Sequence, residues 1–201
     1  MGNTAVYSDY YNRRADYGPA ANDIRHNFVF STVYELPFGP NRTYLTRGVI
    51  SHVIGSWTLG NVTRLYSGAP FSVTTNTNST AAFSSGSQRA NLVGKPELRS
   101  DQRSAQRWFN TAAFAQPANY QFGNAGRNLL RGPGYANLDF SLIRNVNFTE
   151  GKLLQIRGEF FNALNHTNFS TPQSTLGAAN FGTITSSLAA RQIQIGARFV
   201  F

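Results

Sequence analysis

The chain has 201 residues and a formal net charge of +9, yet only 13% of its residues are charged. An aromatic content of 13% argues against a disordered chain, and the shortage of charged helix formers argues against a helical bundle. The absence of cysteine excludes a disulfide framework, a thiolate nucleophile and a cysteine zinc site.

Hydrophobic runs are short throughout the chain. None approaches the roughly 18 residues of a membrane helix, and the first thirty residues contain no apolar core of a secretory signal. The chain is therefore expected to be either cytoplasmic or part of a longer exported protein.

Alternation with a period of two dominates the sequence and predicts β-strands. The first strand is expected over residues 27–36, where Phe28 and Tyr34 share one face and Pro37 follows the end of the strand. A second extended stretch is expected from about Val49 to Tyr66. It resumes over residues 71–75. The side of the sheet to which each of its residues points is ambiguous, because glycines interrupt the stretch.

Three cleaner strands are expected over residues 136–148, 154–161 and 191–201. Each is close to the 9 to 11 residues that cross a bilayer as a tilted β-strand. A tight turn over residues 149–152 joins the first two. Segments rich in Asn, Ser, Gly and Pro, at about 76–134 and 162–189, are expected to be long irregular loops.

Short turns at one rim and long loops at the other are typical of an outer-membrane barrel. Charged side chains should then face a lumen, and the opposite faces of the three cleaner strands should carry no charge, since an Arg in lipid costs roughly 2 to 4 kcal/mol. The predicted lumen-facing charged residues are Glu35, Asp139, Arg157, Glu159 and Arg198. The predicted fold is all-β: an antiparallel, incomplete transmembrane β-barrel of about five long strands, forming an open curved sheet with long external loops. A soluble β-sandwich, whose strands also alternate, is the alternative.

One face of this open sheet is expected to stay exposed in the isolated chain, because its partner is lipid. Both outer strands should have unpaired backbone edges. The side chains expected on the exposed apolar face are Phe28, Tyr34, Leu138, Phe140, Leu154, Ile156, Ile193 and Phe199.

The last eight residues fit a barrel-assembly signal, with a polar residue, a glycine and two aromatic residues at Gln194, Gly196, Phe199 and Phe201. A strand with an aromatic end can add to another sheet while its ring anchors at the membrane interface. Gly196 is expected to leave room for the close approach of a neighbouring chain or side chain.

Several segments occur together in an order that carries a family resemblance. They are ADYGPAANDIRHNFVFS (15–31), YSGAPFSV (66–73), WFNTAAFAQP (108–117), FGNAGRNLLRGPGYANLDFSLIRN (122–145) and RGEFFNALNHTNFSTP (157–172). In this order the chain resembles the C-terminal barrel region of TonB-dependent outer-membrane transporters, among them the Oar-like receptors that carry a carboxypeptidase-regulatory-like domain. The resemblance implies a barrel of about 22 strands, energised uptake of an unidentified substrate, and a location in the outer membrane.

Five strands cannot close a barrel whose smallest natural form has about eight. The chain is therefore expected to be a fragment, with residues 1–25 as an external loop segment and residues 26–201 as the C-terminal part of the barrel. The partners that the resemblance implies are outer-membrane lipid and lipopolysaccharide, the barrel-assembly machinery, and the missing N-terminal barrel and plug, with TonB reached only through that plug.

Catalytic and metal-binding patterns are weak in this sequence. His26, His52 and His166 lie far apart and are expected to hold no metal, and no nucleophile elbow, phosphate loop or dinucleotide fingerprint occurs. Asp139, Arg157 and Glu159 could serve as an acid and base, but an ion-pair ladder across a hairpin is the better interpretation. The chain is expected to be no enzyme and to need no cofactor.

Many of the arginines fall in the predicted loops, where they could meet lipopolysaccharide or an acidic ligand, or could simply solubilise the loops. They are Arg13, Arg14, Arg25, Arg89, Arg99, Arg103, Arg107, Arg127 and Arg131. Their scatter argues against nucleic-acid binding, which needs a compact basic and aromatic patch. The alternative function is a soluble glycan-binding module that uses loop aromatics such as Trp108 and Tyr120.

Overall fold

A computed structural model of the protein describes residues 8, 9, 11–40, 42–81, 88–149 and 151–201. Contacts within the chain divide it into two compact units. The sheet unit comprises His26–Tyr66, Tyr135–Thr167 and Ala189–Phe201. The loop unit comprises Ser67–Gly134, Asn168–Leu188 and the described part of Met1–Arg25.

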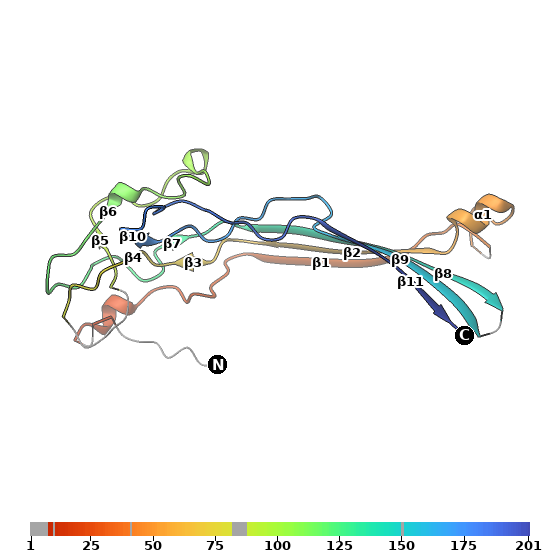
Figure 1. Cartoon of the computed structure of the whole chain (residues 1–201), viewed down its shortest axis with the longest axis horizontal. Helices are drawn as coiled ribbons and strands as arrows, with labels where there is room; N and C mark the ends of the chain where they lie inside the picture. The colour runs from red at the N-terminus through yellow and green to blue at the C-terminus, as the bar shows by residue number, and fades with distance from the viewer. Residues whose placement is uncertain (1–7, 10, 41, 82–87, 150) are drawn as a thin grey trace. The chain divides into compact units, whose positions relative to one another are not determined.

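One antiparallel sheet of five strands makes up most of the sheet unit (Figure 1). Its order is β1-β2-β8-β9-β11, so β1 and β11 are its two edges and the sheet is not closed. The strands are β1 (Asn27–Glu35), β2 (Trp57–Tyr66), β8 (Tyr135–Thr149), β9 (Lys152–Phe161) and β11 (Gln192–Val200). The predicted fold class of five long antiparallel strands in an open sheet is confirmed.

Connections at the two ends of this sheet differ in length. At one end Thr149 pairs with Lys152, and the turn between β8 and β9 contains Gly151 with a φ of 81°. At the other end the chain leaves β2 after Tyr66 and β9 after Phe161, and it returns only at Tyr135 and Gln192. The two longest connections therefore leave the same end of the sheet. The opposite end carries the tight β8–β9 turn and also the connection over residues 36–56 between β1 and β2, which is not short, so the expected separation of short turns from long loops holds only in part.

The expectation of an extended chain from Val49 is wrong. Val49–Ile54 forms the helix α1 between β1 and β2, and β2 begins only at Trp57. Gly48 precedes α1 with a φ of 89°, a conformation that favours glycine and breaks the extended chain. The backbone N–H of Gly55 donates to the Ser51 carbonyl at 3.0 Å and closes the helix after six residues.

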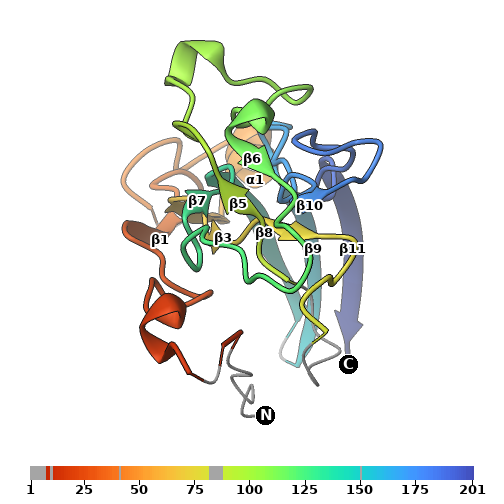
Figure 2. The ribbon, with the colours of Figure 1, turned by 90° about the vertical axis from the view of Figure 1, so that its left-hand side faces the viewer.

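The second extended stretch does not resume in the same sheet. Within residues 70–75 the chain instead forms two short strands of the loop unit. Just before them, a Cβ added to Gly68 would lie 1.8 Å from the Gly132 oxygen, so glycine permits the close approach of these two segments. The short strands pair as β3 (Pro70–Phe71) with β7 (Leu130–Arg131), β4 (Thr74–Thr75) with β10 (Thr175–Leu176), and β5 (Asn91–Leu92) with β6 (Phe114–Ala115) (Figure 2). The 3-10 helices η1 (Arg13–Asp16), η2 (Ser100–Gln102) and η3 (Thr111–Ala113) complete the loop unit.

The loop unit has a hydrophobic core of its own. Phe109 is 1% exposed, and its ring lies 5.9 Å from that of Phe71, 5.8 Å from Phe114 and 5.2 Å from Phe181. All nine buried hydrophobic residues of the described chain belong to this unit. The segment expected to be irregular therefore folds around aromatic residues, although little of it is regular secondary structure.

Asparagine side chains replace the missing secondary structure in this unit. The Leu92 N–H donates to Asn124 Oδ1 at 2.6 Å, and the Asn124 N–H donates to Asn91 Oδ1 at 3.1 Å. Buried Asn128 donates from Nδ2 to the Pro19 carbonyl at 2.6 Å. Such bonds give partners to backbone groups that no neighbouring strand reaches.

A buried ion pair links η1 to the loop that precedes β5. Arg89 Nη1 lies 3.0 Å from Asp16 Oδ1, and both side chains are less than a tenth exposed. Burial raises the pKa of Asp16, but two hydrogen bonds from Ser8 and the charges of Arg89 and Arg127 outweigh it, so the pKa lies below its usual value.

We expect Phe109→Ala to cost the loop unit about 3 to 5 kcal/mol, because the substitution opens a cavity among three aromatic rings. Phe122→Ala, at a side chain that is 41% exposed, is the matched control and should change stability little. Protease cleavage sites in the loop unit, mapped by mass spectrometry on the protein in detergent, measure the effect. Equal cleavage of the two variants would contradict the assignment of Phe109 to the core.

The depressed pKa of Asp16 predicts an acid-sensitive loop unit. The stabilisation is fully present above the unfolded-state pKa of about 3.9, and it is lost as the pH falls through the lower folded-state pKa. Asp16→Asn should abolish this pH dependence and cost about 3 kcal/mol at neutral pH, since Arg89 stays buried without its counterion. Near-UV circular dichroism against temperature at several pH values tests this. Asp101 forms an exposed pair with Arg99, so Asp101→Asn should change neither the stability at neutral pH nor its pH dependence.

Candidate functional site

The register of the five strands separates the side chains onto two faces. Phe28 lies opposite Leu65, Phe140 opposite Phe160, and Phe160 in turn opposite Ile193. These pairs define the apolar face, whose large apolar members are Phe28, Phe30, Tyr34, Leu59, Leu65, Leu138, Phe140, Leu142, Val146, Leu154, Ile156, Phe160, Ile193, Ile195 and Phe199. The other face is called the polar face below.

Exposure on the apolar face depends on the position of the strand. On the edge strands Phe28, Tyr34, Ile193 and Phe199 are each more than half exposed, as predicted. On the central strands Leu138, Phe140, Leu154 and Ile156 are half-buried, which the prediction of full exposure missed. A side chain on a central strand is covered by neighbours on both sides, whereas a side chain on an edge strand is covered on one side only. No described hydrophobic residue of the sheet is buried, so a closed two-layer core is excluded.

Polar residues interrupt the apolar face at two places. Thr32 pairs with Asn61 across β1 and β2, and the Thr63 hydroxyl donates to Asn61 Oδ1 at 3.1 Å. Arg144, near the turn end of β8, is the second exception and corrects the expectation that this face carries no charge. Its guanidinium lies 5.7 Å from the centre of the Trp57 ring, and its Nη1 donates to the Val53 carbonyl at 2.9 Å.

Asp139 is the best-connected acid on the polar face. It lies 3.4 Å from Arg64 Nη1, accepts from Asn137 Nδ2 at 2.8 Å, and accepts the Asn162 N–H at 3.0 Å. The hairpin ladder predicted for Asp139, Arg157 and Glu159 is therefore wrong about the partner of Asp139. The register places Ser141, not Asp139, opposite Glu159, so Asp139 pairs with β2 instead of β9.

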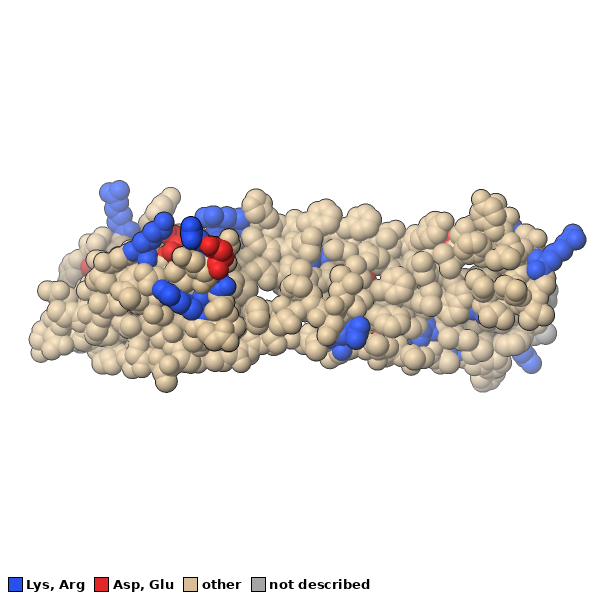
Figure 3. All heavy atoms as spheres, turned by 90° about the horizontal axis from the view of Figure 1, so that it is seen from above, with Lys and Arg blue, Asp and Glu red and all other residues tan. Residues whose placement is uncertain are grey.

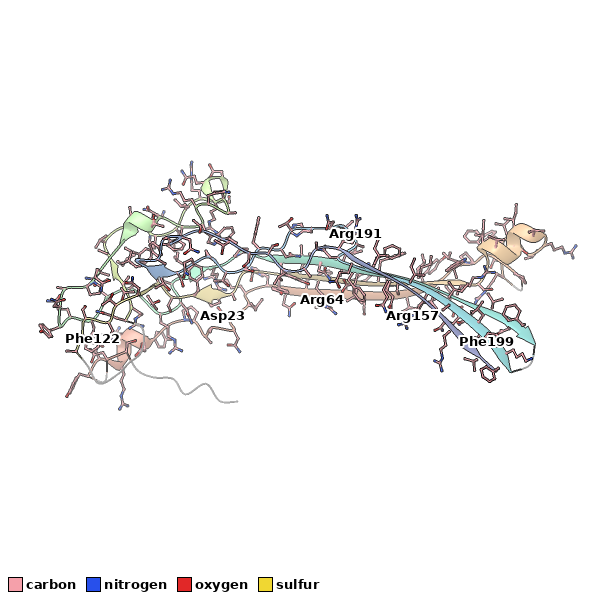
Figure 4. All side chains as sticks on the ribbon, viewed as in Figure 1. Asp23, Arg64, Phe122, Arg157, Arg191 and Phe199 are labelled. Atoms are coloured by element: carbon pink, nitrogen blue, oxygen red, sulfur yellow. The ribbon has the colours of Figure 1, made fainter. Side chains whose placement is uncertain are left out.

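The remaining predicted charges also lie on the polar face. Arg157 and Glu159 are two residues apart on β9 and pair at 3.4 Å (Figure 4 labels Arg64 and Arg157). Glu35 pairs with Arg42 at 2.7 Å, in an exposed position at the end of β1. Arg198 lies opposite Gln155. Facing a lumen remains a prediction for all five residues, but they do share one face of the sheet.

Asn162 has a structural role that was not predicted from the sequence. This residue is 6% exposed, has a φ of 49°, accepts the His166 N–H at 2.9 Å and donates to the His166 carbonyl at 2.9 Å. Together with the Asp139 carboxylate it fixes the turn that follows β9. The available signal was an Asn at the end of a strand, a common position for a left-handed turn residue.

The residues of the predicted assembly signal occupy the free edge of the sheet. Gln194 and Gly196 lie on the polar face opposite Glu159 and Arg157, whereas Phe199 lies on the apolar face opposite Leu154. Phe201 is 93% exposed, and its ring stacks 6.0 Å from that of Phe199, which Figure 4 labels. A Cβ added to Gly196 would lie 3.6 Å from Arg157 side-chain atoms, which is ordinary contact. Close approach to Arg157 therefore does not require a glycine at this position.

Metal ligation finds no support among the residues that the structure describes. They contain no group of three or more His, Asp or Glu side chains placed to hold an ion, and the side chain of His52 lies outside the described set. No helix within the described ranges is long and apolar enough to span a membrane.

A family model for an outer membrane beta barrel domain matches residues 1–194. The chain belongs to this family. It is accordingly an outer-membrane protein, and the apolar face of its sheet is the surface suited to lipid. Searches of curated proteins and of solved structures found no match to the chain.

Membership of the outer membrane beta barrel family explains the place of Arg144. A cation on the lipid side is costly at the midplane and tolerated near an interface, where Trp is also favoured. Arg144 and Trp57 pair directly with each other and lie at the end of the sheet that carries the β8–β9 turn. A cation beside a Trp at this end of the sheet is therefore compatible with a lipid-facing surface.

Asp139→Ala should cost about 1 to 3 kcal/mol and loosen the turn at residues 162–166, because the Asn162 N–H and the Asn137 amide lose their acceptor. Hydrogen exchange of the turn amides in detergent measures this. Glu35→Ala is the control, since its ion pair with Arg42 is exposed and should contribute under about 1 kcal/mol. Unchanged exchange at the turn in Asp139→Ala would show that the carboxylate does not hold it.

Proposed function

We propose that the chain forms part of the barrel wall of a TonB-dependent outer-membrane transporter, which takes up an unidentified substrate. The observation that carries the proposal is the open sheet with one apolar face and one polar face. Such a surface needs lipid on one side and a hydrated or plugged interior on the other. The resemblance of five ordered segments to the barrel region of these transporters supplies the rest of the argument.

The edges of the sheet identify the first partners. Within the described chain, β1 pairs only with β2 and β11 only with β9, so each edge presents backbone groups that hydrocarbon cannot satisfy. We expect further strands of a larger barrel to pair with both edges. The plug inside that barrel would contact TonB, and the barrel-assembly machinery would receive β11 with its terminal aromatic residues.

A catalytic role is not part of this proposal. The acids on the polar face are held by their own neighbours, Asp139 by Arg64 and Glu159 by Arg157, which suits a hydrated wall. The alternative of a soluble β-sandwich module conflicts with the family match and with the five-stranded sheet, on which no described hydrophobic residue is buried.

Substrate depletion from the medium tests active uptake. Cells with and without the gene segment for this chain are compared with and without a protonophore that collapses the inner-membrane gradient. We expect at least one medium component to be consumed only when both the chain and the gradient are present. Uptake that persists without the gradient would identify a passive pore instead, and identical consumption by the two strains would remove the transport proposal.

Phe201→Ala should reduce the amount of folded barrel in the outer membrane several-fold, because the terminal ring is lost as an anchor. The ring is 93% exposed, so the change should cost the folded chain little. Heat-modifiable gel mobility of outer-membrane fractions measures folded barrel, and Phe148→Ala, at another exposed ring near the β8–β9 turn, is the control. Normal abundance of the Phe201→Ala barrel would contradict the assembly role.

A further inference from the structure

A cavity of about 560 Å³ lies within the loop unit. Its lining includes four arginines, Arg25, Arg103, Arg127 and Arg131, but a single acid, Glu97. This volume falls in the range of sites for small organic molecules. On the face drawn in Figure 3, basic side chains gather around a few acidic ones over the loop unit.

Two of the four arginines are held by hydrogen bonds within the loop unit, and two are not. Arg131 is committed to Asp23 through both a side-chain and a backbone oxygen, and Arg103 donates from Nε to the Leu98 carbonyl at 2.9 Å. Among the described residues, no hydrogen bond or ion pair holds the guanidinium group of Arg25 or Arg127, although the charge of Arg127 contributes to the lowered pKa of Asp16. Each carries five N–H donors in a planar fork that matches carboxylate and phosphate oxygens.

An aromatic wall completes the cavity. Trp108 donates from its indole nitrogen to the Arg131 carbonyl at 2.8 Å, which fixes the ring, and the Arg103 guanidinium lies 5.7 Å from the ring centre. Phe109 of the buried core also lines the cavity. Tyr120, the other aromatic residue expected in a glycan site, is not among the lining residues.

Close backbone packing holds another part of the cavity lining. A Cβ added to Gly18 would lie 2.4 Å from the Arg127 oxygen, and Asn128 Nδ2 donates to the Pro19 carbonyl at 2.6 Å. Gly18 therefore lets the segment that carries Tyr17 lie directly against the segment that carries Arg127. These contacts preform the cavity before any ligand arrives.

We propose that this cavity binds a small organic anion, with its carboxylate or phosphate oxygens on Arg25 and Arg127 and its carbon skeleton against Trp108. The excess of cations argues for an anion, and the indole argues for an organic one. This inference goes beyond the proposed function, since binding at the cavity needs neither a plug nor transport.

Tryptophan fluorescence of the full chain in detergent provides the assay, because the chain has only two tryptophans and one lines the cavity. The probes are citrate for carboxylates, glucose 1-phosphate for phosphates, and glucose as the neutral reference. We expect saturable quenching by at least one anion and none by glucose. Comparison of citrate with glucose 1-phosphate shows whether the cavity prefers a carboxylate or a phosphate. The same quenching in a Trp57→Phe background assigns the signal to Trp108.

Charge-matched variants separate the cavity from general attraction. Arg25→Gln/Arg127→Gln should weaken anion binding about tenfold or more, and Glu97→Gln should strengthen it. Arg14→Gln/Arg107→Gln removes the same charge from arginines outside the lining and should change affinity little. Near-UV circular dichroism checks folding. If the double variant misfolds, Arg25→Gln alone, at an exposed side chain, provides the test.

Three results would overturn the proposal. Saturable binding of glucose as tight as that of the anions would make the cavity a neutral-sugar site. Equal weakening by both double variants would make the attraction non-specific. Absence of saturable binding by either anion would leave the cavity without the proposed ligand class.

Discussion

Every backbone N–H and C=O in the hydrocarbon of a membrane must find a partner within the protein, and the five-stranded sheet depends on this constraint. Its three inner strands meet it on both sides, whereas β1 and β11 meet it on one side only. The sheet is therefore stable in lipid only when other strands complete the ring. The same constraint explains why the connections, which cannot satisfy their backbones by pairing, separate to the two ends of the sheet.

Lipid suits the side chains on one face of each strand, and water suits those on the other. The apolar face carries large hydrophobic residues that are exposed or half-buried, although hydrophobic residues of the loop unit reach full burial. The polar face holds ion pairs such as Arg157 with Glu159, which a hydrated interior tolerates at little cost. Asp139 does more than pair with a cation, because it also accepts the N–H of Asn162 and so couples a strand to the turn after β9.

The loop unit is stabilised differently, because it contains a long chain with little regular secondary structure. Aromatic packing around Phe109 supplies the apolar free energy, and asparagine side chains satisfy backbone groups that no strand reaches. Buried Arg89 and Asp16 add an ion pair that ties the N-terminal segment to this core. Loops held in this way can keep a cavity open with its arginines in fixed positions, which a mobile loop would not achieve.

Alternation in the sequence determined β1, β8, β9 and β11 and the face on which each predicted charge lies, because side chains on a strand point to opposite sides in turn. It determined neither the start of β2 nor the side to which its residues point, because glycines interrupt the pattern there. Alternation does not specify the offset between strands, so only the register showed that Asp139 pairs with Arg64 and not with β9. The helix at Val49–Ile54 depended on the backbone of Gly48, and the core around Phe109 joined residues more than a hundred positions apart. The cavity likewise required Arg25 and Arg127, about a hundred positions apart, to line one space. The close packing of Gly18 against Arg127 contributes to this arrangement, which no local pattern encodes.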